Sequence, residues 1–221
     1  DDFEKLIIEE FDLASVKYIK SVNGKDCDER WAKLQLDPER AEEYKNGVFN
    51  GFKYKSGNEM LKLKQNDIVV YGINVYNEGS VKAYAKEVKD TIPSGLVFIK
   101  DSEINKKYGW KMLDSDGNVT DDVNEAVCVV TDYLANDAIN ELSIENNTVN
   151  VDNKTVEVEF KIVEPNTKDR IIENKAEVSK YDDDQGINPK DRDPEERLQE
   201  NIEKLYVKIF DLELEQVISS I

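Results

Sequence analysis

Apolar and polar residues alternate over many short segments of the chain, and this period of two predicts β-strands rather than helices. The clearest segment is residues 67–79, DIVVYGINVYNEG. Its β-branched and aromatic residues favour a buried strand. Val69, Tyr71, Ile73 and Val75 alternate along the segment and would lie on one face of the strand. The segment ends in the turn sequence Asn77-Glu78-Gly79.

Similar runs recur between turn residues along the chain. Residues 11–19 place Phe11, Leu13 and Ile19 on one face at a period of two. Further strands are expected at residues 84–90, 95–98, 110–113, 126–131, 154–163 and 170–179. Many short strands separated by turns predict an all-β, Ig-like β-sandwich.

Two segments interrupt the β pattern. Within residues 26–46, Asp37-Pro38 is typical of a helix start and Gly47 of a helix end, which predicts a small helical insertion within about residues 26–60. Residues 181–201, YDDDQGINPKDRDPEERLQEN, are acidic, almost devoid of hydrophobic residues and contain two prolines. Such a composition predicts a linker between modules.

A ten-residue sequence recurs in similar form near the other end of the chain. EKLIIEEFDL at residues 4–13 returns as EKLYVKIFDL at residues 203–212, an offset of 199. Self-similarity at a fixed offset is typical of a tandem array. We therefore expect one sandwich module over residues 1–180, an acidic linker over residues 181–201, and the first strand of the next repeat over residues 202–221.

The charge balance narrows the classes of function. The chain has 48 acidic and 30 basic residues, a net charge of -18, which disfavours nucleic acid and anionic membrane surfaces as partners. It has no histidine, so the usual general base near neutral pH, Ser-His and Cys-His pairs and histidine-ligated zinc are excluded. No run approaches the about 20 apolar residues of a membrane helix. Signals for export and anchoring are expected outside these residues.

Cys27 and Cys128 are the only two cysteines, too few for a zinc cluster or a disulfide framework. The sequence leaves open whether they form one bridge or remain two thiols.

Three polar residues occupy positions that alternation assigns to the interior. Lys17 shares parity with Leu13 and Ile19, Asp90 with Val88 and Tyr84, and Asn174 with Ile172, Ala176 and Val178. A lone buried charge costs several kcal/mol unless it is paired or neutralised. Three such exceptions on three strands predict one shared site.

An apolar site would favour a neutral lysine amine and a protonated carboxyl group. The Lys17 amine would then attack the side-chain amide of Asn174, with Asp90 as the acid and proton shuttle, and expel ammonia. The predicted product is an amide cross-link between the first and last strands of the sandwich.

Several motifs resemble the DUF11-like, or isopeptide-forming D2-type, repeat domains of Gram-positive, clostridial-type cell-surface and fimbrial proteins. They are VKDTIPSGLVF (88–98), the preceding NDIVVYGINVYNEG, IIENKAEVS (171–179), FDLASVKYI and INKKYGWKMLDSDGNVT. The resemblance covers about residues 1–195. It implies that Lys17, Asp90 and Asn174 are the lysine, the acid and the asparagine of an intramolecular isopeptide bond. In the second copy of the repeat, Gln216 stands where Lys17 stands in the first.

A purely structural interpretation of the same residues is open. Lys17 would extend its amine to solvent at the sandwich edge, Asp90 would cap a turn before Pro93, and Asn174 would bond to backbone.

Calcium is the one cofactor that the acidic clusters suggest. Asp182, Asp184, Asp191 and Asp193 form a candidate site in the linker, with a solvated linker as the alternative. Residues 114–125 place oxygen-bearing side chains at EF-hand spacing but have Val119 where that loop needs glycine. A hairpin turn at Asp116-Gly117 is the favoured interpretation.

Together these observations predict a non-enzymatic stalk or adhesin repeat of a bacterial cell-surface protein, in contact with neighbouring repeats. The alternative is a module that binds a host protein or glycan. Aromatic residues of the insertion are the candidate surface for it, or else pack over one end of the sandwich: Trp31, Tyr44, Phe49, Phe52 and Tyr54.

Overall fold

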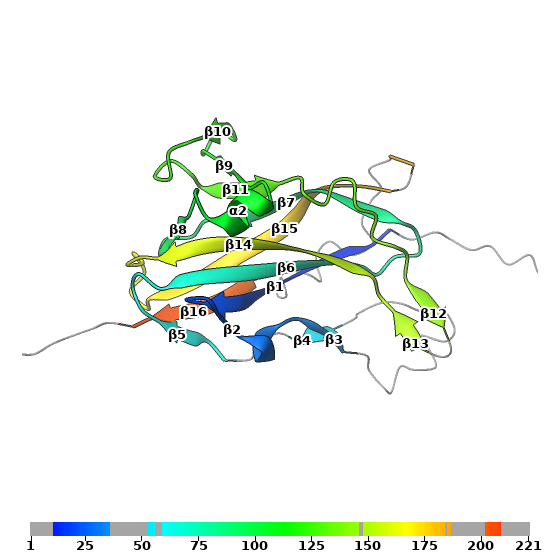
Figure 1. Cartoon of the computed structure of the whole chain (residues 1–221), viewed down its shortest axis with the longest axis horizontal. Coiled ribbons are helices and arrows are strands. Elements are labelled where there is room, and N and C mark those ends of the chain that lie inside the picture. The colour runs from blue at the N-terminus through cyan, green and yellow to red at the C-terminus, as the bar shows by residue number, and fades with distance from the viewer. Residues whose placement is uncertain are drawn as a thin grey trace, which may run out of the picture.

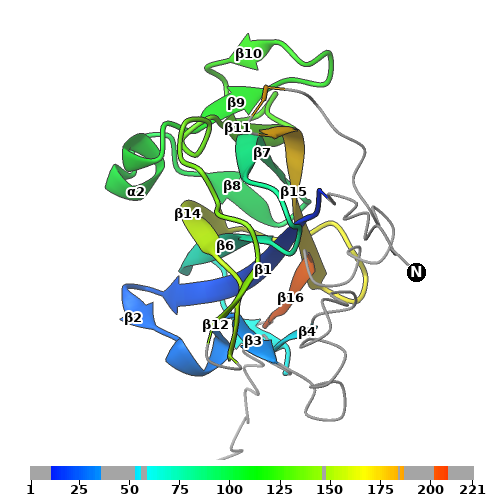
Figure 2. The same ribbon diagram turned by 90° about the vertical axis from the view of Figure 1, so that its right-hand side faces the viewer.

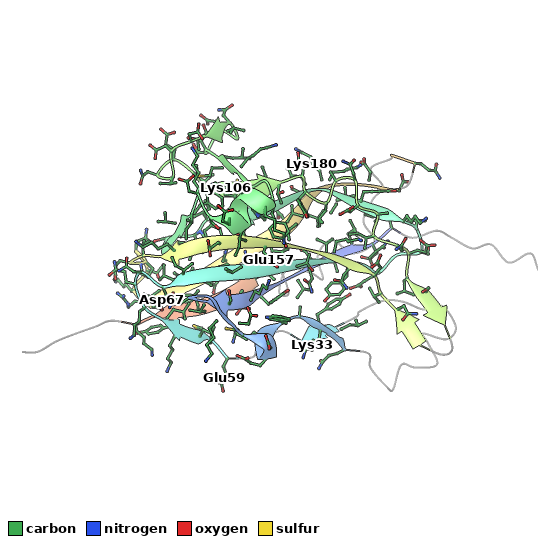
Figure 3. The ribbon with its side chains drawn as sticks, in the orientation of Figure 1. Lys33, Glu59, Asp67, Lys106, Glu157 and Lys180 are labelled. Atoms are coloured by element: carbon green, nitrogen blue, oxygen red, sulfur yellow. The ribbon has the colours of Figure 1, made fainter. Side chains whose placement is uncertain are left out.

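The computed structural model of the chain describes residues 11–35, 53–55, 59–145, 148–183, 185–186 and 202–208. Over these residues the fold is a sandwich of two β-sheets, which confirms the prediction of an all-β, Ig-like sandwich (Figure 1). Charged side chains such as Glu59, Lys106 and Lys180 lie at the periphery of the molecule (Figure 3).

The first sheet has five strands in the order β2-β1-β6-β14-β8, all antiparallel. Three long strands, β1, β6 and β14, run side by side through its centre (Figure 1). The bounds are β1 Leu13–Val22, β2 Lys25–Asp26, β6 Ile68–Asn77, β8 Leu96–Phe98 and β14 Asn153–Ile162.

The second sheet has seven strands in the order β10-β9-β11-β7-β15-β16-β5. The strands from β10 to β16 can be followed from top to bottom in Figure 2. Its pairs are antiparallel except β16 with β5, which is parallel. The bounds are β5 Leu61–Leu63, β7 Ala83–Thr91, β9 Lys111–Leu113, β10 Val119–Thr120, β11 Cys128–Thr131, β15 Ile171–Asp183 and β16 Ile202–Val207.

Smaller elements surround the two sheets. Two further antiparallel pairs are formed by β3 (Lys33–Gln35) with β4 (Lys53–Lys55) and by β12 (Ser143–Glu145) with β13 (Thr148–Asn150). A short helix, α2 (Glu103–Lys107), begins at Ser102, whose hydroxyl accepts from the N–H groups of Ile104 and Asn105. The sequence pattern did not predict this helix, because it spans little more than one turn.

The main core lies between the two sheets and follows the predicted alternation. Val69, Tyr71, Ile73 and Val75 are fully buried on β6. The outer face of β1 is buried as well, because Ala14 and Val16 pack against Tyr54, Tyr76 and Leu142. β1 is therefore covered on both faces, whereas the sequence predicted an interior on only one.

Every strand expected from the sequence is present, and its ends differ from the expected bounds by at most four residues. The parity assigned to β7 was wrong in one respect. Ala83, Ala85, Val88 and Asp90 are buried, while Tyr84 is half-buried. An irregularity in the pairing of β7 with β15 between Val178 and Tyr181 shifts the alternation, so Tyr84 does not share a face with Asp90.

The structure describes only the flanks of the expected helical insertion. Residues 28–30 form a single 3-10 turn, η1 (Asp28–Arg30), and β3 and β4 pair as antiparallel strands. The expected helix start at Asp37-Pro38 and its end at Gly47 lie outside the described residues.

The acidic segment connects two strands of one sheet. β15 continues through Tyr181 to Asp183, beyond the expected start of a linker, and Tyr181 stacks on Phe11 with ring centroids 5.0 Å apart. After the segment the chain returns as β16, which pairs with β15. Residues 202–207 thus belong to the sandwich itself, which the expected division into module, linker and next repeat had not anticipated.

The turn at Asp116-Gly117 is confirmed as the β9–β10 hairpin. Asp114 Oδ1 accepts from the N–H groups of Asp116 at 2.9 Å and Asn118 at 2.8 Å, and Gly117 has a positive φ of 81°. These hydrogen bonds within the turn satisfy the Asp114 carboxylate, which would occupy the first ligand position of an EF-hand loop.

Gly72 provides a test of the packing between β1 and β6. A Cβ at this position would lie 2.4 Å from Cζ of Tyr18, which pairs with it across the two strands. We expect Gly72→Ala to lower the free energy of unfolding by about 1–3 kcal/mol, as overpacked substitutions do. Gly72→Ala combined with Tyr18→Val should cost less than the sum of the single changes in urea denaturation. Additive costs would contradict the close approach.

Candidate functional site

Lys17 lies in the middle of β1 and points into the space between the sheets. It pairs with Ile73 on β6, and none of its surface is exposed. Its Nζ makes a hydrogen-bonded ion pair with Asp90 Oδ2 in the opposite sheet and lies 4.6 Å from the centroid of the Tyr71 ring. The lysine therefore bridges the two layers of the sandwich.

Asp90 lies on β7, a central strand of the seven-stranded sheet. Val129 of β11 is its register partner on one side and Ala176 of β15 on the other. The side chain is fully buried, and its second oxygen, Oδ1, has no hydrogen-bond partner among the described residues. One carboxyl oxygen is thus engaged by Lys17 while the other remains available.

Asn174 lies on β15, two residues before the partner of Asp90. The two side chains are therefore diagonal neighbours on the inward face of adjacent strands, a separation of about 7 Å between Cα atoms. Asn174 is fully buried, and in the part of the chain that the structure describes neither Nδ2 nor Oδ1 has a hydrogen-bond partner. Burying unpaired polar atoms costs about 1–3 kcal/mol each.

Three further residues complete the site and were not singled out from the sequence. Tyr71 supplies the ring beneath Lys17, and its hydroxyl has no partner among the described atoms. Glu203 on β16 is the register partner of Asn174 and forms a buried ion pair with Arg30. Arg30 also donates from Nη1 to the carbonyl of Glu59 at 2.6 Å.

The sequence carried a signal for two of these residues. Tyr71 shares the inward parity of Val69 and Ile73, and Glu203 shares that of Leu205 and Val207. Glu203 was overlooked because its segment was assigned to another repeat. Arg30 lies in an irregular turn without periodicity, so no pattern could have predicted its burial.

Burial governs the protonation of the site. Desolvation lowers the pKa of Lys17, opposed by the charge and hydrogen bond of Asp90 and by the charge of Glu203. Desolvation raises the pKa of Asp90, opposed by Lys17 and by the amide of Asn174. Both shifts favour transfer of the proton from the amine to the carboxyl group. A completed transfer would leave a neutral nucleophile and a neutral acid.

The pKa values of Tyr71 and Glu203 shift in the same direction as that of Asp90. Burial raises the pKa of Tyr71 well above its usual value, reinforced by the charges of Asp90 and Glu203. Burial also raises the pKa of Glu203, opposed by its hydrogen bond and ion pair with Arg30. The side-chain amide of Asn174 influences both Asp90 and Tyr71, although neither contact has the geometry of a full hydrogen bond.

The purely structural interpretation of the three residues does not match this geometry. Lys17 does not reach solvent, Asp90 is paired in the core rather than capping a turn, and Asn174 makes no bond to backbone among the described residues. The structure thus brings Lys17, Asp90 and Asn174 together as predicted. The cross-link would join β1 to β15, which is not the last strand, because β16 follows it.

The remaining sequence predictions concern a calcium site, the two cysteines and membrane helices. Asp182 lies 3.5 Å from Lys86, while Asp184, Asp191 and Asp193 lie outside the described residues, so the calcium site stays a prediction. Cys27 and Cys128 are both unpaired thiols. Within the described ranges no helix has the length and apolar character needed to cross a bilayer.

The insertion aromatics are partly described. Tyr54 is buried and stacks on Tyr76 with ring centroids 4.2 Å apart. Trp31 is half-buried and donates to the Lys20 carbonyl at 3.2 Å. Tyr44, Phe49 and Phe52 lie outside the described residues.

No protein-family model and no curated protein sequence matches this chain. The assignment of function therefore depends on the geometry of the site.

The cost of burying Asp90 without its ion-pair partner can be measured in variants that lack Lys17. Neither Lys17→Met nor Lys17→Met/Asp90→Leu can form the cross-link, and only the first leaves a carboxyl group alone in the core. We expect the double variant to have a larger free energy of unfolding, by about 1–3 kcal/mol at pH 7.

The difference should grow as the pH rises from 4 to 7. The folded-state pKa of Asp90 is raised by burial, so the folded protein must keep a proton that the unfolded chain releases. Urea denaturation at several pH values measures this. Equal stabilities across the range would show that Asp90 is solvated in the folded state.

Proposed function

We propose that this chain is a structural stalk or adhesin repeat of a bacterial cell-surface protein, stabilised by an autocatalytic isopeptide bond between Lys17 and Asn174. The observation that supports it most is the dry environment of Asn174. Its amide is buried beside a buried amine and a buried acid, and it has no hydrogen-bond partner in the part of the chain that the structure describes. A structural asparagine would have its amide satisfied, whereas a reactive one needs its carbonyl carbon open to attack.

The reaction balances within the chain. The neutral Nζ of Lys17 attacks Cγ of Asn174 while protonated Asp90 donates a hydrogen bond to Oδ1. Asp90 then accepts the proton from the attacking nitrogen and transfers one to Nδ2. The Cγ–Nδ2 bond breaks, ammonia leaves, and an Nζ–Cγ amide remains. No oxidant, metal or cofactor takes part in this scheme.

The surroundings of the three residues favour the same step. The Tyr71 ring lies against the amine and holds it away from water. Excluding water keeps the carboxyl group protonated and prevents hydrolysis of the polarised amide. The reaction occurs once in each chain, and the reacting chain is itself the product. The protein is therefore proposed to be a self-modifying structural module rather than an enzyme.

A mechanical role follows from where the bond lies. It would join β1 in one sheet to β15 in the other. Tension applied to the ends of the chain would pass through the bond and bypass residues 18–173. A repeat whose residues 18–173 cannot be extended under tension suits a stalk outside the cell, which is the proposed location, with neighbouring repeats as its partners.

The alternative, a module that binds a host protein or glycan, has less support. It requires insertion aromatics exposed in one patch. Of the two that are described, Tyr54 is buried and Trp31 is half-buried.

The mass of the intact, purified chain tests the proposal. We expect it to be lower than the mass calculated from the sequence by one ammonia. Lys17→Ala, Asn174→Ala and Asp90→Ala should each restore the calculated mass, because each removes the nucleophile, the electrophile or the acid. Lys175→Ala is the matched control, since it removes a neighbouring lysine with partial exposure and should keep the deficit. An unmodified wild-type mass would contradict the cross-link.

Single-molecule stretching tests the mechanical role. Pulled from its two ends, the wild-type chain should release no length from residues 18–173, because the bond carries the tension past them. Asn174→Ala should release that length in an unfolding event. A wild-type trace that matches the Asn174→Ala trace would leave the module without a mechanical function.

A further inference from the structure

The repeated ten-residue sequence has two halves, and the structure shows the role of one half in each copy. In the second copy, Glu203–Val207 is most of β16 and fills a position between β15 and β5. In the first copy, Phe11 and Asp12 are buried immediately before β1, and Leu13 is its first residue. The first half of the motif therefore completes a sheet, and the second half begins a sandwich.

The two copies share the inward positions of β16, and the outward Lys204 is matched by Lys5. Glu203, Leu205 and Val207 are buried, and their counterparts are Glu4, Leu6 and Ile8. The first two are identical, and the third exchanges one β-branched residue for another. The outward Tyr206 is matched by Ile7, and the exposed Lys208 by Glu9. Residues 4–8 thus carry what is needed to fill the position that β16 occupies.

We propose that, in a tandem array, residues 4–8 of each repeat form the last strand of the preceding repeat, between its β15 and its β5. The partner that fills this position in the sheet is a second copy of the same module. This inference rests on the proposed function only in that it requires repeats in tandem. Two residues, Glu9 and Glu10, then separate the strand given to one repeat from the Phe11 that starts the next, so adjacent repeats abut.

The shared strand also completes the reactive site. Glu203 is the register partner of Asn174, is ion-paired with Arg30 in the core, and its charge acts on Lys17. In an array Glu4 of the following repeat would supply this carboxylate. The surroundings of the cross-link in one repeat would then depend on the presence of the next.

A tandem protein tests the proposal, with residues 1–202 followed directly by residues 4–221. Glu4 of the second unit then takes the place of Glu203 in the first. Cys27→Ser and Cys128→Ala in both units remove the native thiols. Glu173 and Lys204 are register partners on the outward face, with Nζ 2.6 Å from Oε1. Their counterparts in the tandem are Glu173→Cys in the first unit and Lys5→Cys in the second.

We expect this pair to form a disulfide on mild oxidation of the folded protein. The 221-residue chain with Glu173→Cys and Lys204→Cys should form the equivalent bridge. Replacing Lys5→Cys by Glu9→Cys, four residues out of register, should prevent it. Tryptic mass spectrometry identifies each bridge.

Three results would overturn the proposal: a bridge in the single chain but not in the tandem, equal bridging at residues 5 and 9, or no bridge in the single chain, which would remove the strand pairing itself. The number of ammonia molecules lost by the same tandem reports the cross-link separately. A failure of strand sharing is therefore distinguishable from a failure of the proposed function.

Discussion

The burial of Lys17 and Asp90 between two apolar sheets is the constraint on which the rest of this structure depends. An ionised pair without water is costly, and both pKa shifts act to remove its charges. The neighbouring amide of Asn174 is equally dry and has no hydrogen-bond partner among the described residues. These costs are hard to explain as stabilisation of the fold. They are expected if the three groups react and are replaced by one uncharged amide.

The period-two pattern was sufficient to predict the fold and to place the three polar residues in one interior. Lys17 and Asn174 were recognised because their neighbours in parity are apolar. The pattern gave the wrong neighbour for Asp90 at Tyr84, since a local irregularity in strand pairing leaves no signal in composition. It also could not assign β16, because sequence similarity to residues 4–13 does not reveal which sheet a strand joins. Arg30 was beyond prediction, since its burial depends on an ion pair with a residue 173 positions away.

The sheet arrangement links the chemistry to a route for tension. Lys17 and Asn174 lie in opposite sheets, so a bond between them closes the sandwich across its core. β16 lies beyond that bond and is held by non-covalent contacts, namely strand pairing, packing and the buried ion pair of Glu203 with Arg30. If this strand comes from the following repeat, residues 4–8 of each repeat have two roles. They complete the seven-stranded sheet of the preceding repeat, and they carry tension into their own repeat. The acidic segment after β15 then joins two strands of one sheet rather than spacing two modules.

Locating the bond in the chain is the most direct test of the central claim. The purified protein is denatured, digested and sequenced by tandem mass spectrometry, with Asp90→Ala treated in parallel. We expect a branched peptide in the wild type, joined through Nζ of Lys17 and Cγ of Asn174, and two separate linear peptides in the variant. Recovery of unmodified Lys17 and Asn174 peptides from the wild type would contradict it.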